Sequence, residues 1–160
     1  MFYKMRNLSM WHNFLKILSP DNKKKELTGD EAIATILVRA AKTDNAYTKS
    51  EQNLIEKLLS IQIQVTIAEA TKLRARGEDL EREINDNVQL TRIIKNEIQY
   101  ENRHELIQKL WQIIIDDDIR TPEENKFMRV LAHLLGVNDV QSAQARAKAM
   151  IIKDKNTTQT

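Results

Sequence analysis

Cysteine is absent from this chain of 160 residues. Its absence excludes disulfides, thiolate metal sites, redox pairs and cysteine nucleophiles, and it is compatible with a reducing compartment. The chain also has only three glycines and two prolines, which leaves little room for turns and strands. With 25 basic and 23 acidic residues, the net charge of +2 is too balanced to indicate a nucleic-acid surface.

Apolar residues recur at helical spacings of three and four, so the sequence predicts an all-α fold. A chain of this length suits one domain that buries roughly 70% of its unfolded surface. We expect a compact bundle of seven to eight helices over residues 27–152. Residues 64–85 predict a long charged helix with Gly77 as a candidate break, and residues 153–160 predict a polar, disordered tail.

The sequence also contains an approximate copy of itself. An offset of 73 positions places Leu37, Asp44, Thr48 and Glu51 over Leu110, Asp117, Thr121 and Glu124. Each copy has an apolar helical run, a short loop with an Asp, and a Thr-x-x-Glu signature that opens a second apolar helix. This signature is a capping box, in which the Thr and Glu side chains accept hydrogen bonds from each other's backbone N–H groups. We therefore predict a duplicated helix-loop-helix with approximate two-fold symmetry.

Residues 1–26 differ in composition from the rest of the chain. The first 20 residues contain no Asp or Glu and hold four of the eight aromatic residues. On a helix, one face would carry the apolar side chains Trp11, Phe14, Leu15 and Leu18. The segment is too short to span a bilayer and lacks the features of a signal peptide. Two interpretations stay open: the helix packs on the domain, or its apolar face binds a membrane surface or a partner.

The two Asp-loop-Glu units are the candidate chemical sites. Hard cations such as calcium and magnesium take several oxygen ligands, which facing carboxylates, backbone carbonyls and water can supply. The candidate ligands are Asp44, Glu51, Asp116, Asp117, Asp118 and Glu124. A structural interpretation competes with this one, because each Glu completes a capping box and each Asp suits a turn. An EF-hand is excluded, because its closing Glu is missing.

These motifs resemble those of the TerB-like (tellurite-resistance protein B-like) family. The resemblance covers about residues 27–148 and is carried best by Leu110-Trp111, Asp117, Pro122, Glu124 and 134–137, the sequence Leu-Leu-Gly-Val. Family members usually have Ala-Asp-Gly in each loop, whereas this chain has 43–45, Thr-Asp-Asn, and 116–118, Asp-Asp-Asp. Asn and Asp also tolerate a left-handed backbone, so we expect the loop geometry to be kept.

The resemblance implies that the acidic positions are divalent-metal sites, with calcium, magnesium or zinc as the candidate ions. It also implies a bacterial stress-response module linked to tellurite resistance. We expect a cytoplasmic protein, held against the inner membrane if the N-terminal helix binds lipid. No phosphate loop, nucleophile elbow or metallohydrolase motif occurs, so we expect no enzyme. The alternative function is a metal-independent protein-interaction domain of the co-chaperone-associated type.

Overall fold

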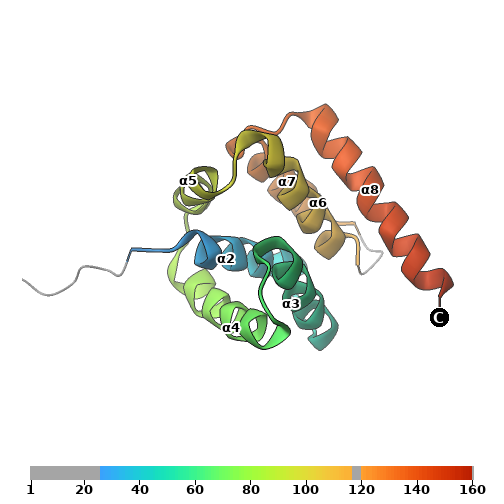
Figure 1. Ribbon diagram of the computed structural model, residues 1–160. Helices are drawn as coiled ribbons and strands as arrows, with labels where there is room; N and C mark the ends of the chain where they lie inside the picture. The colour runs from blue at the N-terminus through green and yellow to red at the C-terminus, as the bar shows by residue number, and fades with distance from the viewer. Residues whose placement is uncertain (1–25, 117–119, 160) are drawn as a thin grey trace, which may run out of the picture.

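The computed structural model describes residues 26–116 and 120–159, and within these ranges the chain is all-α, as predicted (Figure 1). No β-strand occurs in the described residues. The α-helices are α2 (Gly29–Ala41), α3 (Lys49–Ile63), α4 (Ile67–Glu83), α5 (Asn87–Glu97), α6 (Arg103–Ile114), α7 (Pro122–Leu134) and α8 (Asp139–Thr158). Two short 3₁₀ turns, η1 (Lys42–Asp44) and η2 (Tyr100–Asn102), join some of them.

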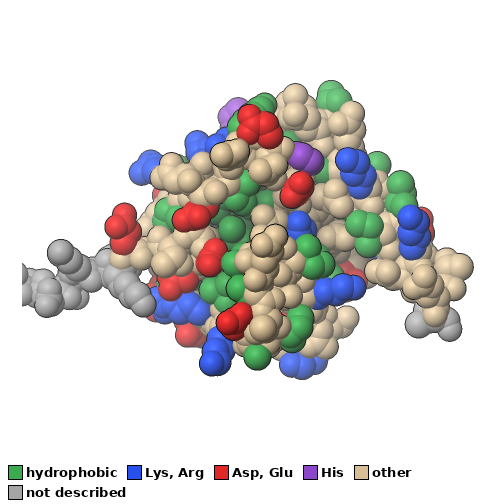
Figure 2. Space-filling model, viewed as in Figure 1, with side chains coloured by type: hydrophobic (Ala, Val, Ile, Leu, Met, Phe, Trp, Pro, Cys, Tyr) green, Lys and Arg blue, Asp and Glu red, His purple; other side chains and the backbone are tan. Residues whose placement is uncertain are grey.

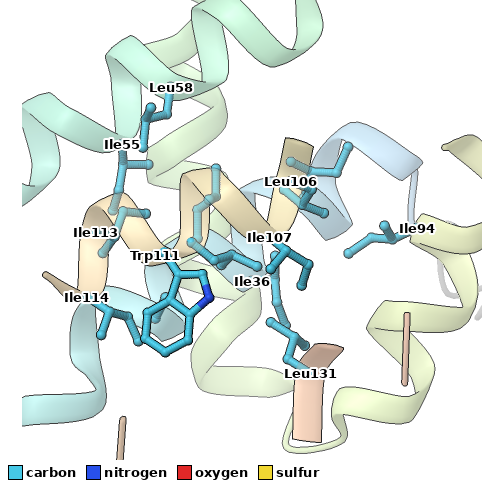
Figure 3. Packing of buried hydrophobic residues seen from close by; sticks show 14 of the residues in the cluster. Ile36, Ile55, Leu58, Ile94, Leu106, Ile107, Trp111, Ile113, Ile114 and Leu131 are labelled. Carbon is cyan, nitrogen blue, oxygen red and sulfur yellow. The ribbon is translucent and has the colours of Figure 1, made fainter. Parts of the chain in front are cut away.

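Helix α2 is the centre of the bundle. It packs against α3, α4, α5 and α6, and α6 packs in turn against α8. Most of its side chains are buried, including Ile36, Leu37 and Val38, which are fully enclosed. Figure 3 shows Ile36 beside Ile107 and the Trp111 ring, where α2 meets α6. The apolar runs of both predicted copies therefore form one core.

The predicted helix starts are confirmed. Thr48 and Thr121 each head a complete capping box, at the start of α3 and α7. Gly136 ends α7 with a positive φ of 74°, and the N–H of Val137 reaches back to the carbonyl of Ala132 at 2.8 Å. That backbone bond satisfies a carbonyl at the helix end, as in a Schellman motif. The two helix-loop-helix units begin and end where the sequence predicts, whereas their common origin stays a prediction.

Gly77 does not break the charged helix, because α4 is continuous from Ile67 to Glu83. The residue instead lies where α4 packs on α2. A Cβ atom at Gly77 would lie 2.9 Å from the backbone carbonyl carbon of Ala34. Glycine is therefore needed here for the close approach of two helices.

Buried ion pairs join the helices around α4. Arg74 donates to Glu56 on α3 at 2.8 Å and also bonds Glu78, and both Arg74 and Glu56 are nearly enclosed. Arg39 on α2 and Lys42 pair with Glu81 at 3.6 and 3.1 Å. Glu81 thus ties α4 to α2, whereas Asp79 pairs with Arg82 on the exposed face of α4, which is the solvated face that the charge pattern indicates.

The C-terminal part differs from prediction. Helix α8 continues to Thr158, so the expectation of a disordered tail from residue 153 is wrong for residues 153–158. The Lys153 ammonium donates to the carbonyl of Ile115 at 2.6 Å, which ties this last stretch to the end of α6. No helix in the described part of the chain is long and apolar enough to cross a membrane.

Candidate functional site

The site is built from the two loops that follow α2 and α6. The first loop comprises η1 and the residues up to Thr48, and the second joins Ile114 to Thr121. Turn η1 packs against α7, and α3 packs against α6. Each loop of one unit therefore lies beside the second helix of the other unit, which brings acidic residues from both predicted copies into one region.

In the first loop, Asp44 holds a tight turn. Its Oδ1 accepts a hydrogen bond from the N–H of Ala46 at 2.9 Å, and Asn45 takes a left-handed φ of 62°. Asn45 stands where the family pattern has Gly, so the expected loop geometry is confirmed. Glu51 then accepts from the N–H of Thr48 through Oε2 at 2.8 Å. Asp44 and Glu51 thus have the turn and capping roles of the structural interpretation.

The second unit repeats the cap. Glu124 accepts from the N–H of Thr121 through Oε2 at 3.0 Å, and its own N–H donates to Thr121 Oγ1 at 3.2 Å. Asp116 is exposed just after α6, and its N–H donates to the carbonyl of Ile113. Asp117 and Asp118 lie outside the described residues.

Both capping carboxylates are buried. Glu51 is 5% exposed and Glu124 is 2% exposed. In each of them, the hydrogen bonds use Oε2, and no described residue donates to Oε1. A carboxylate in a buried residue is costly to keep charged, which favours either a proton or a cation at this place.

The electrostatics link the two loops directly. Burial raises the pKa of Glu51, and the negative charges of Asp44 and Asp116 raise it further against the hydrogen bonds from Thr48. Burial likewise raises the pKa of Glu124, and Asp44 and Glu123 add to the effect while Thr121 and Arg120 oppose it. Asp44 therefore acts on the buried carboxylate of its own unit and on that of the other unit. A cation placed near Asp44 would therefore lower the cost of charge on both buried carboxylates.

The described ranges contain no group of three or more His, Asp or Glu side chains placed to hold a metal ion. The candidate ligand set is thus incomplete without Asp117 and Asp118, which lie beyond those ranges. Among the described residues, Asp44 and Asp116 act electrostatically on Glu51, and Asp44 also acts on Glu124. Carboxylate oxygens fit hard divalent cations in their chemistry, and the caps leave Oε1 of each Glu for such a role.

A family model, described as tellurite resistance protein TerB, matches residues 30–147. The chain belongs to the TerB family. Neither the comparison with curated proteins nor that with solved structures gives a significant match. The matched TerB region begins at the start of α2 and ends within α8, so both acidic loops lie inside it.

The predicted apolar face of the N-terminal segment, comprising Trp11, Phe14, Leu15 and Leu18, lies outside the described residues. The sequence analysis of this TerB-family chain did not predict a cavity that adjoins the candidate site. Between α6 and α8 lies a cavity of about 160 Å³, lined in part by Trp111, Arg146 and Met150. The Arg146 guanidinium lies 5.6 Å from the centre of the Trp111 ring, a cation–π distance. Arg120 and Glu124 also line this cavity, so it adjoins the second acidic unit. It forms only where α6, α7 and α8 meet, and no local sequence pattern predicts it.

Proposed function

We propose that this TerB-family chain is a non-enzymatic module that binds a divalent cation between its two acidic loops. The observation that carries the proposal is the packing of η1 on α7, which lets Asp44 act on the buried carboxylates of both helix-loop-helix units, Glu51 and Glu124. A cation placed among them would offset the repulsion and desolvation that raise the pKa values of both buried carboxylates. The proposed setting is bacterial stress physiology around tellurite and other toxic oxyanions, in the cytoplasm.

The choice of ion follows from the donors. All candidate side-chain ligands are carboxylates, so calcium and magnesium are favoured over ions that prefer sulfur or imidazole. Zinc remains a candidate through carboxylate oxygens alone. Asp117 and Asp118 would complete the ligand set from the second loop. The cation would then link the end of α2 to the start of α7. A partner protein that contacts this surface would therefore bind differently with and without the ion.

The test is a titration of calcium, magnesium, manganese and zinc into the whole chain, followed by melting temperature and calorimetry. Binding at a hundredfold over the dissociation constant adds about 2.7 kcal/mol to stability. The informative variants are Asp44→Asn and Glu124→Gln. Each removes a charge but keeps an oxygen that can accept the same backbone hydrogen bond. A saturable response that these variants abolish supports the proposal.

Asp86→Asn is the matched control. Asp86 caps α5 by accepting from the N–H of Val88 at 2.8 Å, the same kind of bond that Asp44 makes, and it lies outside the acidic loops. This variant should keep the full response to the ion. If no ion changes the melting temperature, or if Asp44→Asn responds like the parent chain, the acidic residues are only caps and turns.

A second candidate function is protein interaction without a metal. Helix α8 exposes Met150 and Ile151, at 45% and 54%, and Met150 also lines the cavity beside Trp111. An amphipathic helix of a partner protein could bury such side chains. Capture of a partner from lysate in the presence of chelator, lost on Met150→Asp and Ile151→Asp, would favour this function over cation binding.

A further inference from the structure

A hollow of about 670 Å³ lies where the start of α2, the end of α3, the end of α5 and the start of α6 meet. Its lining is mostly polar with an acidic rim, and three isoleucines form a small apolar floor. The floor includes Ile33, Ile63 and Ile98, and the rim includes Asp30, Glu97 and Glu105. Figure 2 shows green side chains at the bottom of this hollow with several red ones around it.

No Lys or Arg is among the described residues that line the hollow. The three acidic side chains on its rim are exposed. In addition, the side-chain oxygen of Gln62, on the wall formed by α3, is buried and accepts no hydrogen bond from the described residues. Such a surface fits an occupant with an apolar face, positive charges at its edges and a hydrogen-bond donor.

The chain itself contains a segment with these properties. Residues 1–25 hold six of the 25 Lys and Arg residues but only one of the 23 Asp and Glu residues. The remaining 135 residues, with 19 basic and 22 acidic side chains, are net acidic. The same segment has an apolar face of Trp11, Phe14, Leu15 and Leu18 when placed on a helix, and the Trp11 indole N–H is a donor without acceptor character.

We propose that the basic, aromatic segment of residues 1–25 docks into the acid-rimmed hollow of its own chain. The connection permits it, because Asp30 and Ile33 of the hollow belong to the first turns of α2. Ten residues separate Leu18 from Gly29, and such a stretch spans about 33 Å when extended. The apolar face covers the isoleucine floor, and the lysines and arginines lie against Asp30, Glu97 and Glu105.

Docking to a tethered segment has a simple energetic advantage. The short connection gives the segment a high effective concentration at the hollow, so modest apolar burial and surface ion pairs are sufficient for occupancy. It also covers the side chains of Ile63 and Ile98, which are partly exposed in the hollow. A membrane surface would satisfy the same apolar face and the same positive charges, so the experiment has to separate the two.

The absence of cysteine makes spin labelling of the full chain straightforward. A nitroxide on Asn13→Cys, on the polar face of the segment, should broaden the backbone amides of Ile63, Ile98 and Asn102 by paramagnetic relaxation. The amides in the middle of α8, around Met150, should be little affected, because α8 lies across the molecule from α5 (Figure 1). Broadening confined to another surface, or absent altogether, overturns the proposal.

Two charge reversals form a matched pair. Glu97 and Glu83 are the last residues of α5 and α4, both are exposed, and a Lys at either place suits the end of a helix. Glu97→Lys should lower the relaxation enhancement at the hollow by about threefold or more, the size expected from losing surface ion pairs, whereas Glu83→Lys should leave it unchanged. Equal effects of the two variants would contradict docking at the rim.

Two further experiments test whether another molecule, in place of residues 1–25, occupies the hollow. Spin-labelled chain mixed with unlabelled, isotope-enriched chain reports contacts between copies, and broadening in that mixture would mean that a second copy fills the hollow. Vesicles with about 30% anionic phospholipid test the membrane. If the label is immobilised only when vesicles are added and never reports the hollow in solution, the membrane is the partner of residues 1–25 and the proposal is wrong.

Discussion

Replacing Gly77 by alanine tests how closely α4 approaches α2. A Cβ atom at this position would lie 2.9 Å from the carbonyl carbon of Ala34, 3.0 Å from its carbonyl oxygen and 3.1 Å from its Cβ. Two of these three atoms are backbone atoms of the central helix, and Ala34 is fully buried. They cannot rotate away as the end of a flexible side chain would, so the helices themselves must move apart.

Two opposing effects decide the sign. In an exposed helix, Gly→Ala stabilises by about 0.8–1.0 kcal/mol, because alanine loses less backbone entropy. Overpacking a close-packed core costs about 1–3 kcal/mol, and a clash with backbone atoms belongs toward the upper end of that range. We therefore expect Gly77→Ala to lower the free energy of unfolding by about 1–2 kcal/mol. For a chain of this size, that corresponds to a fall in melting temperature of about 2–8 °C.

Urea denaturation followed by far-ultraviolet circular dichroism measures the change, with Thr71→Ala as the control. Thr71 is only partly buried on the same helix, and its hydroxyl donates to the carbonyl of Ile67 within α4. Thr71→Ala should therefore raise stability by a few tenths of a kcal/mol through helix propensity alone. If Gly77→Ala is also stabilising, the close approach of α4 to α2 is wrong.

Three further predictions concern the buried polar groups. Arg74→Met leaves Glu56 buried without its partner and should lower the free energy of unfolding in urea by about 3 kcal/mol. Most of this loss should be recovered in the double variant with Glu56→Gln, and additive effects of the two substitutions would contradict the ion pair. Thr121→Ala removes the acceptor for the N–H of Glu124 and should cost about 1 kcal/mol by thermal melting, whereas Thr121→Ser should keep most of the stability. The pKa of Glu124 is raised by burial above its ordinary value of 4.5, so the folded chain keeps this proton to a higher pH than the unfolded chain. The stability that this proton contributes is therefore present below pH 4.5 and is lost as the pH rises through the folded pKa. Glu124→Gln should flatten the dependence of melting temperature on pH in that range. An unchanged slope would refute the raised pKa of Glu124.

The helix boundaries were the most predictable part of the structure, because capping is local. A Thr at the N-cap and a Glu three residues later form their bonds within one turn, so Thr48 and Thr121 mark helix starts without reference to the rest of the chain. The same holds for Gly136, where a positive φ ends α7. The end of α8 was missed, because its last turns contact the end of α6 through Lys153, which is distant in sequence.

The sequence predicts which residues belong to the candidate site, but not that residues of the two units lie near one another. The loop acids and the capping acids stand out in the sequence, and each has a local role. Only the packing of η1 on α7 puts Asp44 close enough to act on Glu124 as well as on Glu51. Whether these residues also hold a cation depends on that contact, which no local pattern encodes.

The sequence by itself determined the helical class, the caps and the family, because apolar periodicity, capping boxes and loop motifs act over a few residues. The tertiary structure alone decided what each ambiguous residue does. Gly77 is a contact point between α4 and α2, and Glu78 accepts a hydrogen bond at 2.7 Å from the Tyr47 hydroxyl, which belongs to the loop before α3. The acid-rimmed hollow likewise exists only because four helix ends, far apart in the chain, come together on one surface.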